Sequence, residues 1–302
     1  MRSSAPAPGR DATPADVDAF LRRFARFGAE ASVETYHALF DPGVRLFDDG
    51  MERPIGYDEI PAHIAGVLGL VKGFRMTIER WRARENVVFV EAHNGGEIAG
   101  TPVGWRAVYR IELAGGLVVD GRRYFDRAPL LARLGASAAA PAGASASGPG
   151  TSAGHRVETP AARADAPATL SDAVAPRELP VAALVSQLAA VWREGDFDAL
   201  AEPFREDATL AAPGLARPLA RAEIPAWARE LAGRMRGTPR AVRRWAGDDA
   251  LLFVEWALGG GGSPAAPHPG IVERFDLVAG RVLAARAYHD SAAIERFCAA
   301  RP

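Results

Sequence analysis

The sequence predicts an α+β protein that contains two tandem copies of one unit. A constant offset of 164 residues relates the copies, because Tyr124 corresponds to Tyr288 and Asp126 to Asp290 (288 − 124 = 164 and 290 − 126 = 164). Within each copy, apolar residues first recur at helical spacing and later alternate with a period of two. A segment rich in Ala, Gly, Ser and Pro separates the copies. One register that holds without a gap across many residue types indicates a tandem duplication.

These patterns divide the 302 residues into four regions. We expect a disordered arm over 1–12, a first domain over 13–135, a flexible linker over 136–177 and a second domain over 178–302. The compositions of the arm and the linker cannot offset the entropy lost on ordering. With 48% hydrophobic residues in the chain, each domain can bury a core of its own.

Helices open the first domain. Thr13 as N-cap and Pro14 at the first helical position begin the first of them. The spacing of apolar residues predicts helices over 14–27, 33–40 and 57–71, and a short strand over 44–48. That strand is expected to lead into a turn at Asp49-Gly50, because both residues favour turns.

A sheet completes the first domain. Period-two alternation predicts strands over 74–82, 87–94, 104–113 and 117–126. The intervals between them are too short for helical crossovers, which excludes a parallel doubly wound sheet and favours an antiparallel meander. A short helix over 127–134, with Asp126 at its start, closes the domain.

The second domain repeats this plan. Helices are expected over 181–192, 197–204 and 223–235, with a strand near Thr209 and later strands that end at Asp290. The second copy departs from the first at 259–269, where glycines and prolines cannot continue a strand ladder. We therefore expect a flexible loop there.

Composition excludes several classes of partner. The formal net charge of -1 provides no positive field for nucleic acid or for an anionic membrane. No apolar run reaches the length of a membrane span, and the first ten residues lack the apolar core of a signal peptide, so we expect a cytoplasmic protein. The single cysteine, Cys298, is expected to be a buried apolar residue. No cluster of potential ligands has metal-binding spacing, and we expect neither a metal nor a cofactor.

The order of elements resembles a known family. Two or three helices, a bent antiparallel sheet, and a last strand that ends in Tyr124-Phe125-Asp126 before a short helix resemble the nuclear transport factor 2 (NTF2-like) fold and its SnoaL-like group. The resemblance implies that each domain wraps its sheet into a cone around an apolar pocket. The family includes polyketide cyclases, ketosteroid isomerases and limonene-type epoxide hydrolases as well as non-enzymatic binding proteins, so the fold alone does not assign a function.

The resemblance carries over to some functional residues. Asp126 corresponds to the general acid or base aspartate on the last strand of epoxide hydrolases and polyketide cyclases, and Asp290 is its counterpart in the second copy. Asp48 corresponds to the base of the isomerases, where the second copy has Ala212. These correspondences make Asp126 and Asp48 the leading candidates for proton transfer.

Other family positions differ in this chain. The residues that match the isomerases' oxyanion hole are Phe24 and Ala107, which cannot donate a hydrogen bond. The arginine and aspartate that epoxide hydrolases need on the third strand are replaced by Ala92 and Asn94. Neither of these two active sites is therefore complete.

Four residues are predicted to be catalytic: Asp126, Asp48, His93 and Tyr124. A carboxylate beside a phenol in a partly buried site could have a pKa suited to proton transfer, and a histidine could relay the proton. Each has a structural alternative. Asp126 and Asp290 could cap the final helices, Asp48 could be a turn acid, and His93 could be an ordinary strand histidine.

Aromatic residues are expected to form the core, and some of them to line a ligand cavity. The predicted ligand-binding residues are Phe24, Tyr36, Phe47, Phe89, Trp105, Tyr288 and Asp290.

Two functions are consistent with the sequence. The first is a cofactor-independent isomerase, cyclase or hydrolase that acts on a hydrophobic, oxygenated small molecule in the first domain. The second is a non-catalytic ligand-binding or scaffold protein, whose second domain is a degenerate partner in an internal pseudo-dimer. Asymmetry between the copies favours a single working pocket, because Asp48 and His93 correspond to Ala212 and Ala257. We expect the halves to pair within the chain or the chain to form a homo-oligomer.

Overall fold

The computed structural model describes residues 12–48, 51, 53–139, 180–259 and 269–299. The predicted arm, the turn at 49–50, nearly all of the predicted linker and the tip of the loop at 259–269 lie outside the described residues.

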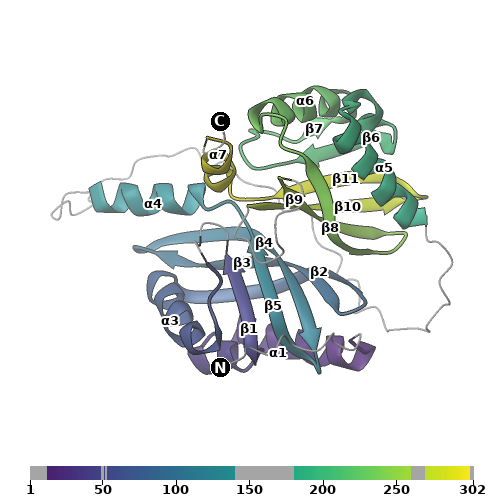
Figure 1. Cartoon of the computed structure of the whole chain (residues 1–302). Helices are drawn as coiled ribbons and strands as arrows, with labels where there is room; N and C mark the ends of the chain where they lie inside the picture. Colours follow the sequence, from purple (N-terminus) through teal and green to yellow (C-terminus); the bar gives the residue numbers. More distant parts are fainter. Residues whose placement is uncertain (1–11, 49–50, 52, 140–179, 260–268, 300–302) are drawn as a thin grey trace, which may run out of the picture.

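Two α+β units form the molecule, which confirms the predicted fold class. Each unit packs helices on one face of a sheet, and the other faces of the two sheets meet in the middle of the molecule (Figure 1). The layers therefore run helices, sheet, sheet, helices. Within the described ranges, no helix is long and apolar enough to cross a membrane.

The first unit contains four α-helices and five strands among the described residues. Its helices are α1 (Pro14–Ala29), α2 (Val33–His37), α3 (Ile60–Leu70) and α4 (Ala128–Ala139), with a 3-10 turn η1 (Tyr57–Glu59). Its strands are β1 (Phe40–Asp48), β2 (Lys72–Arg84), β3 (Val87–Ile98), β4 (Thr101–Ala114) and β5 (Leu117–Tyr124). The strand order in the sheet is β1-β5-β4-β3-β2.

Helix α1 shows how the sequence specifies this unit. Thr13 and Asp16 form a capping box, in which the Asp16 N–H donates to the Thr13 hydroxyl over 3.2 Å and the Thr13 N–H donates to the Asp16 carboxylate over 2.9 Å. The buried residues Val17, Phe20, Phe24 and Phe27 recur at helical spacing on the face that meets the sheet. The cap sets where the helix begins, and the apolar stripe sets which face it buries.

Two features of this unit differ from the sequence prediction. The second helix ends at His37, and β1 already begins at Phe40. Residues 41–43, which were expected to separate the helix from the strand, therefore lie within β1, where its pairing with β5 is irregular. In addition, β1 pairs with β5 in parallel, with Leu46 opposite Gly121, and the sheet is therefore not wholly antiparallel. Helix α3 and strands β2 to β4 lie between β1 and β5 in the chain, which is enough for a parallel return.

The second unit repeats the same order. Its helical segments are α5 (Pro180–Glu194), η2 (Phe197–Ala201), η3 (Arg221–Glu223), α6 (Ile224–Arg234) and α7 (Ser291–Ala299). Its strands are β6 (Phe204–Ala211), β7 (Leu219–Ala220), β8 (Arg240–Gly247), β9 (Leu251–Leu258), β10 (Gly270–Val278) and β11 (Arg281–Tyr288). The strand order is β7-β6-β11-β10-β9-β8, and β6 pairs with β11 in parallel as β1 does with β5. The predicted helix over 197–204 is only a short 3-10 segment that leads into β6.

An apolar cluster joins the two sheets. The rings of Phe89 and Phe253 stack at its centre, with centroids 5.8 Å apart. The cluster consists of Val87, Phe89, Val108, Tyr124, Ala246, Leu251, Phe253, Val272 and Tyr288. Phe89 and Phe253 are equivalent residues under the offset of 164, so the same position of each copy lies at the centre of the contact.

Polar contacts between the sheets also come in equivalent pairs. The Tyr124 hydroxyl donates to Glu255 over 2.5 Å, and the Tyr288 hydroxyl donates to Glu91. Arg274 forms an ion pair with Glu91 at 2.8 Å, and Arg110 forms the corresponding pair with Glu255 at 3.5 Å. Each contact has its counterpart 164 residues away, so the interface has the self-complementary pattern of a two-fold dimer.

Candidate functional site

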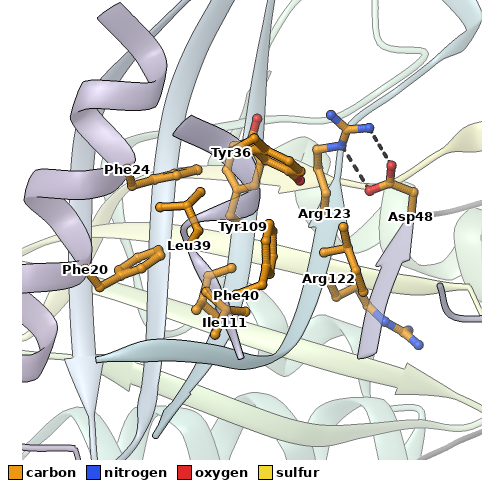
Figure 2. Close-up of a pocket in the computed structure, with 12 residues that line it drawn as sticks. Phe20, Phe24, Tyr36, Leu39, Phe40, Asp48, Tyr109, Ile111, Arg122 and Arg123 are labelled. Atoms are coloured by element: carbon orange, nitrogen blue, oxygen red, sulfur yellow. Dashed lines mark hydrogen bonds and ion pairs between the residues drawn. The ribbon is translucent and has the colours of Figure 1, made fainter. Parts of the chain in front are cut away.

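The candidate site is a cavity inside the first unit, between α1, α2 and the inner face of the sheet (Figure 2). Its lining residues are Phe20, Phe24, Tyr36, Leu39, Phe40, Leu46, Asp48, Tyr109, Ile111, Val118, Arg122 and Arg123. Most of these side chains are aromatic or aliphatic, and the charged ones lie together at one end. The lining is therefore apolar over most of its surface and charged at one end.

Aromatic side chains pack closely around this cavity. Phe20 stacks on Phe24 at 5.4 Å between centroids, and Phe24 meets the ring of Tyr109 edge-on at 5.0 Å. Tyr36 meets Phe40 edge-on at 4.9 Å. The remaining free volume is about 10 Å³, about the room that one water molecule needs. A larger ligand can enter only if some of these side chains move.

Four polar side chains follow one another across the inner face of the sheet, from β1 to β3. Asp48 on β1 is paired with Arg123 on β5, and Arg123 is paired with Tyr109 on β4. The Tyr109 hydroxyl donates to Asn94 Oδ1 on β3 over 3.0 Å. We call Asp48, Arg123, Tyr109 and Asn94 the polar row.

A bidentate ion pair forms one end of the polar row. Arg123 Nε donates to Asp48 Oδ1 over 3.0 Å, and Arg123 Nη2 donates to Asp48 Oδ2 (Figure 2). His63 Nε2 from α3 lies 3.4 Å from the same Oδ2. This arrangement holds the carboxylate with both oxygens occupied.

Charge dominates the ionisation of this pair. Burial raises the pKa of Asp48. The charge of Arg123 and the hydrogen bond from His63 outweigh this effect and lower the pKa to about 2. Burial lowers the pKa of Arg123, and the neighbouring Asp48 carboxylate more than reverses that effect. Both groups therefore remain charged at neutral pH.

The two tyrosines of the site stay protonated. Burial raises the pKa of Tyr36 and of Tyr109 above the usual value for a phenol, although the charge of Arg123 acts in the opposite direction. Their hydroxyl groups are therefore neutral hydrogen-bonding groups at neutral pH.

The structure brings three of the predicted site residues together in the cavity: Asp48, Phe24 and Tyr36. Trp105 lies on the same inner face of the sheet, where its ring approaches Phe74 and Phe125 at 6.2 Å between centroids. Phe47 lies outside this cavity and lines a separate hollow, where the Arg122 guanidinium stacks on its ring at 4.6 Å.

Two predicted catalytic residues lie elsewhere. Asp126 Oδ1 accepts a hydrogen bond from the Ala128 N–H over 3.2 Å at the start of α4, and it does not line the cavity. His93 is exposed on the outer face of β3. Because successive strand residues point to opposite faces, His93 points away from the cavity, whereas Ala92 and Asn94 point inward. We therefore include neither residue in the candidate site.

The other predicted residues lie between the units. Phe89, Tyr124 and Tyr288 belong to the apolar cluster that joins the sheets, and both hydroxyl groups are bound to glutamates of the opposite unit. Asp290 is buried, caps α7 by accepting from the Ala292 N–H over 3.0 Å, and pairs with Arg127. This corrects the expectation that these side chains face a ligand, because the outer face of each sheet is covered by the other sheet.

The sequence prediction missed four polar residues of the site: Arg123, Tyr109, Asn94 and His63. A signal for the first two was present in the repeat. Arg123 corresponds to Ala287 in the second copy and Tyr109 corresponds to Glu273, so the fold does not require either residue. A systematic search for polar residues that the other copy does not share would have found them. It would also have found His63, which corresponds to Trp227, but the contact of His63 with Asp48 depends on the distance between α3 and β1.

Comparison with protein families found one matching model, in the first unit. Residues 17–121 match the model of the SnoaL-like domain. No curated protein matches the chain.

Several solved structures resemble parts of this chain. AclR from Streptomyces galilaeus is 16% identical and covers 41% of this chain and 83% of its own, with a TM-score of 0.37. A SnoaL-like protein from Jannaschia sp. CCS1 is 21% identical and covers 44% of this chain and 100% of its own, with a TM-score of 0.36. An LEH-like epoxide hydrolase from M. tuberculosis is 20% identical and covers 41% of this chain and 91% of its own, with a TM-score of 0.34.

The matched segment begins within α1 and ends within β5, so it contains ten of the twelve cavity-lining residues, and Arg122 and Arg123 follow directly after it. Most of the candidate cavity therefore lies within the segment, residues 17–121, that matches the SnoaL-like domain.

Proposed function

We propose that the first unit binds a hydrophobic small molecule that carries an oxygen group. The apolar body of the ligand would lie among Phe20, Phe24 and Phe40, and its oxygen would face the polar row. Burial of the aromatic walls would supply most of the affinity, and the polar groups would set the orientation of the ligand.

The observation that carries this proposal is the difference between the two units. Asp48, Arg123 and Asn94 correspond to Ala212, Ala287 and Leu258. The second unit forms the equivalent strands β9 and β11 with Leu258 and Ala287 at these positions, where Leu258 is paired with Arg240 and Ala287 with Glu273. Buried ions and amides cost free energy unless they are fully paired, so a row that the fold does not need is best explained by a ligand.

A catalytic role is a further candidate within this proposal. In it, the site acts as a cofactor-independent isomerase, cyclase or hydrolase by acid-base chemistry. With a pKa of about 2, Asp48 is a weak base at neutral pH. Its 3.4 Å contact with His63 favours a different division of roles, in which Asp48 orients the imidazole and His63 exchanges the proton. The alternative is a non-catalytic binding protein in which the second unit is a scaffold.

The proposal is tested with the full chain and small aromatic ketones such as 1-tetralone. The double variant Asp48→Asn/Arg123→Met removes both charges together and so leaves no lone buried ion. We expect ketone binding, measured by calorimetry, to weaken by roughly tenfold or more, because a hydrogen bond to a charged group contributes about 1.5 to 3 kcal/mol.

The matched control is Arg229→Met, which removes an exposed arginine that pairs with Asp198 on the surface of the second unit. We expect it to bind the ketone as the wild type does. Equal affinity of the double variant and the wild type would contradict the proposal. Conversion of a bound compound by the wild type would favour the enzyme, whereas binding without conversion across the ketone series would favour the binding protein.

A further inference from the structure

Among the buried side-chain N–H groups of the first unit that have no hydrogen-bond partner in the described residues, two belong to residues on the inner face of the sheet. They are Asn94 Nδ2 and Trp105 Nε1. The Asn94 side chain is fully buried. An unpaired donor in such a place costs roughly 1 to 3 kcal/mol, so each one calls for an explanation.

The two groups are neighbours on the inner face of the sheet. Asn94 on β3 lies directly opposite Trp105 on β4, and side chains at such positions are in contact distance. The next inward pair, Ala92 and Ala107, is also in register and is fully buried. These small side chains leave room for Asn94 to reach the Tyr109 hydroxyl.

The hydrogen bonds of the polar row run in one direction. Arginine can only donate, and Arg123 is paired with Tyr109 across β5 and β4. The Tyr109 proton is then available for Asn94 Oδ1, which it reaches over 3.0 Å. With its oxygen occupied, Asn94 has only its N–H groups left for a ligand, and the residue opposite it on β4, Trp105, carries the second N–H group without a partner among the described residues.

The second unit shows that the fold does not need these donors. Asn94 corresponds to Leu258, and Trp105 corresponds to Pro269. Leucine has no polar side-chain atom and proline has no side-chain N–H. Leu258 is buried in the apolar core of the second unit. The second unit therefore packs this position with a side chain that has no hydrogen-bond donor.

From these observations we infer that Asn94 and Trp105 together bind an acceptor oxygen of the ligand, such as the carbonyl oxygen of an aromatic or alicyclic ketone. This inference rests on the proposed function and names the group that the ligand must carry. A site built to hydrogen-bond a substrate group discriminates strongly against an analogue that lacks the group, because the donors of the site are then left unpaired.

The test uses two probes of nearly the same shape, the ketone 1-tetralone and its hydrocarbon analogue tetralin. Both are titrated into the ¹⁵N-labelled full chain, and the indole N–H resonances of its six tryptophans are followed by NMR. The resonance lost in Trp105→Phe identifies Trp105. We expect 1-tetralone to bind at least threefold more tightly than tetralin and to shift the Trp105 resonance downfield, while tetralin leaves that resonance near its starting position.

Variants separate the two donors from the apolar pocket. Trp105→Phe and Asn94→Leu should each reduce the preference for ketone over hydrocarbon by roughly three- to tenfold, because a single neutral hydrogen bond contributes about 0.5 to 1.5 kcal/mol. Both should still bind tetralin. Trp227→Phe, in α6 of the second unit, is the matched control and should keep the wild-type preference.

The outcomes distinguish this inference from the proposed function. If the wild type binds both probes equally, or if both variants keep its preference for the ketone, the inference is wrong and the hydrophobic binding site stands. If the wild type binds neither probe, the proposed function is lost for this class of ligand, and the inference falls with it. The variants are compared only where their amide spectra show a folded chain. Trp105→Phe keeps an aromatic ring, although a smaller one, at the position between Phe74 and Phe125.

Discussion

At the scale of single residues, Asp48 and Asp126 show how the environment separates two carboxylates that look alike in the sequence. Asp48 is buried, and Arg123 holds both of its oxygens. Asp126 is partly exposed and caps α4 through the Ala128 N–H. Asp48 ends a strand before the predicted turn, and Asp126 follows a strand before a helix. Residue preferences for turns and helix caps therefore do not distinguish the two aspartates. Only the contacts from distant parts of the chain distinguish the site residue from the cap.

His289 provides a residue-scale prediction on stability. Burial and the charge of Arg240 lower its pKa to about 4 from the ordinary value of 6.5, and Asp290 only partly opposes them. Between these two values the unfolded chain binds a proton that the folded chain does not, so stability falls as the pH falls. The equivalent residue of the first unit is Phe125, which is also buried.

We therefore expect His289→Phe to raise the free energy of unfolding by about 2 kcal/mol more at pH 5 than at pH 8, because each unit of pKa shift is worth about 1.4 kcal/mol. Urea unfolding at the two pH values measures this difference. The pH 8 value serves as the internal control for any change in packing, since His289 is neutral there in both states. A variant whose stability relative to the wild type is the same at both pH values would contradict the prediction.

At the scale of elements, the two copies begin their last helix with an equivalent aspartate, but the two aspartates make different numbers of contacts. Asp126 and Asp290 occupy equivalent positions, and each accepts backbone N–H bonds at the start of its helix, α4 and α7. Asp126 is partly exposed, whereas Asp290 is fully buried and also pairs with Arg127 of the other unit. The first is only a helix cap, and the second also joins the units.

This difference predicts unequal costs of substitution. Asp126→Ala should lower the free energy of unfolding by about 1 kcal/mol, the typical value of a helix cap. Asp290→Ala should cost about 3 kcal/mol, because it removes the cap and also leaves Arg127 without its buried partner. Chemical denaturation measures both.

Asp207→Ala is the control, because Asp207 is an exposed carboxylate on β6 that pairs only with Arg205 in the contacts described here. Its cost should stay within about 0.5 kcal/mol, the usual range for a surface position. Equal costs for Asp126→Ala and Asp290→Ala would show that Asp290 does not link the units.

At the scale of the whole molecule, the two sheets form an interface that is apolar at the centre and charged around it. Phe89 and Phe253 stack at the centre, and Glu91 and Glu255 each hold a tyrosine and an arginine of the opposite unit. Further ion pairs lie around them, between Arg80 and Asp276 and between Arg244 and Glu112. The duplication thus places two copies of one self-complementary surface in the same chain.

The buried glutamates should dominate the stability of this interface. Glu91→Gln would remove the fully buried carboxylate that pairs with Arg274 and leave it, among the described residues, only Asp276, at 2.9 Å, as a charge partner. Breaking a buried pair costs up to about 3 to 5 kcal/mol, and the remaining pair with Asp276 should keep the cost toward the lower end of that range. Glu255→Gln should act in the same direction through Arg110. We expect thermal unfolding to show a large fall in midpoint for both variants.

Asp198→Asn tests whether burial is the cause. Asp198 pairs with Arg229 on the surface, and exposed pairs contribute about 0 to 1 kcal/mol. Added salt should remove the small effect of this pair and leave the effect of Glu91→Gln largely unchanged, because buried pairs are screened less. A Glu91→Gln variant as stable as Asp198→Asn would contradict the assignment of Glu91 as a main contact between the units.

Much of the fold could be predicted from the sequence, and the reasons are local. The offset of 164 residues determined that one unit is used twice, and Thr13, Pro14 and the apolar stripe of α1 determined where a helix begins and which side it buries. Alternation determined the four meander strands, which the structure contains with slightly different ends. These properties follow from neighbouring residues, so the sequence was sufficient.

Tertiary structure alone decided which face of the sheet holds the site. All residues of β3 from 87 to 92 are buried, because helices cover one face of the sheet and the other sheet covers the opposite face. Period two identifies residues that share a face, but with both faces buried it cannot show which face looks into the cavity. Tyr124 and His93 were therefore assigned to the cavity when they belong to the outer face, and Arg123 and Asn94 were missed on the inner one. The parallel return of β1 beside β5, which brings Asp48 to Arg123, likewise depends on residues more than 70 positions apart in the chain.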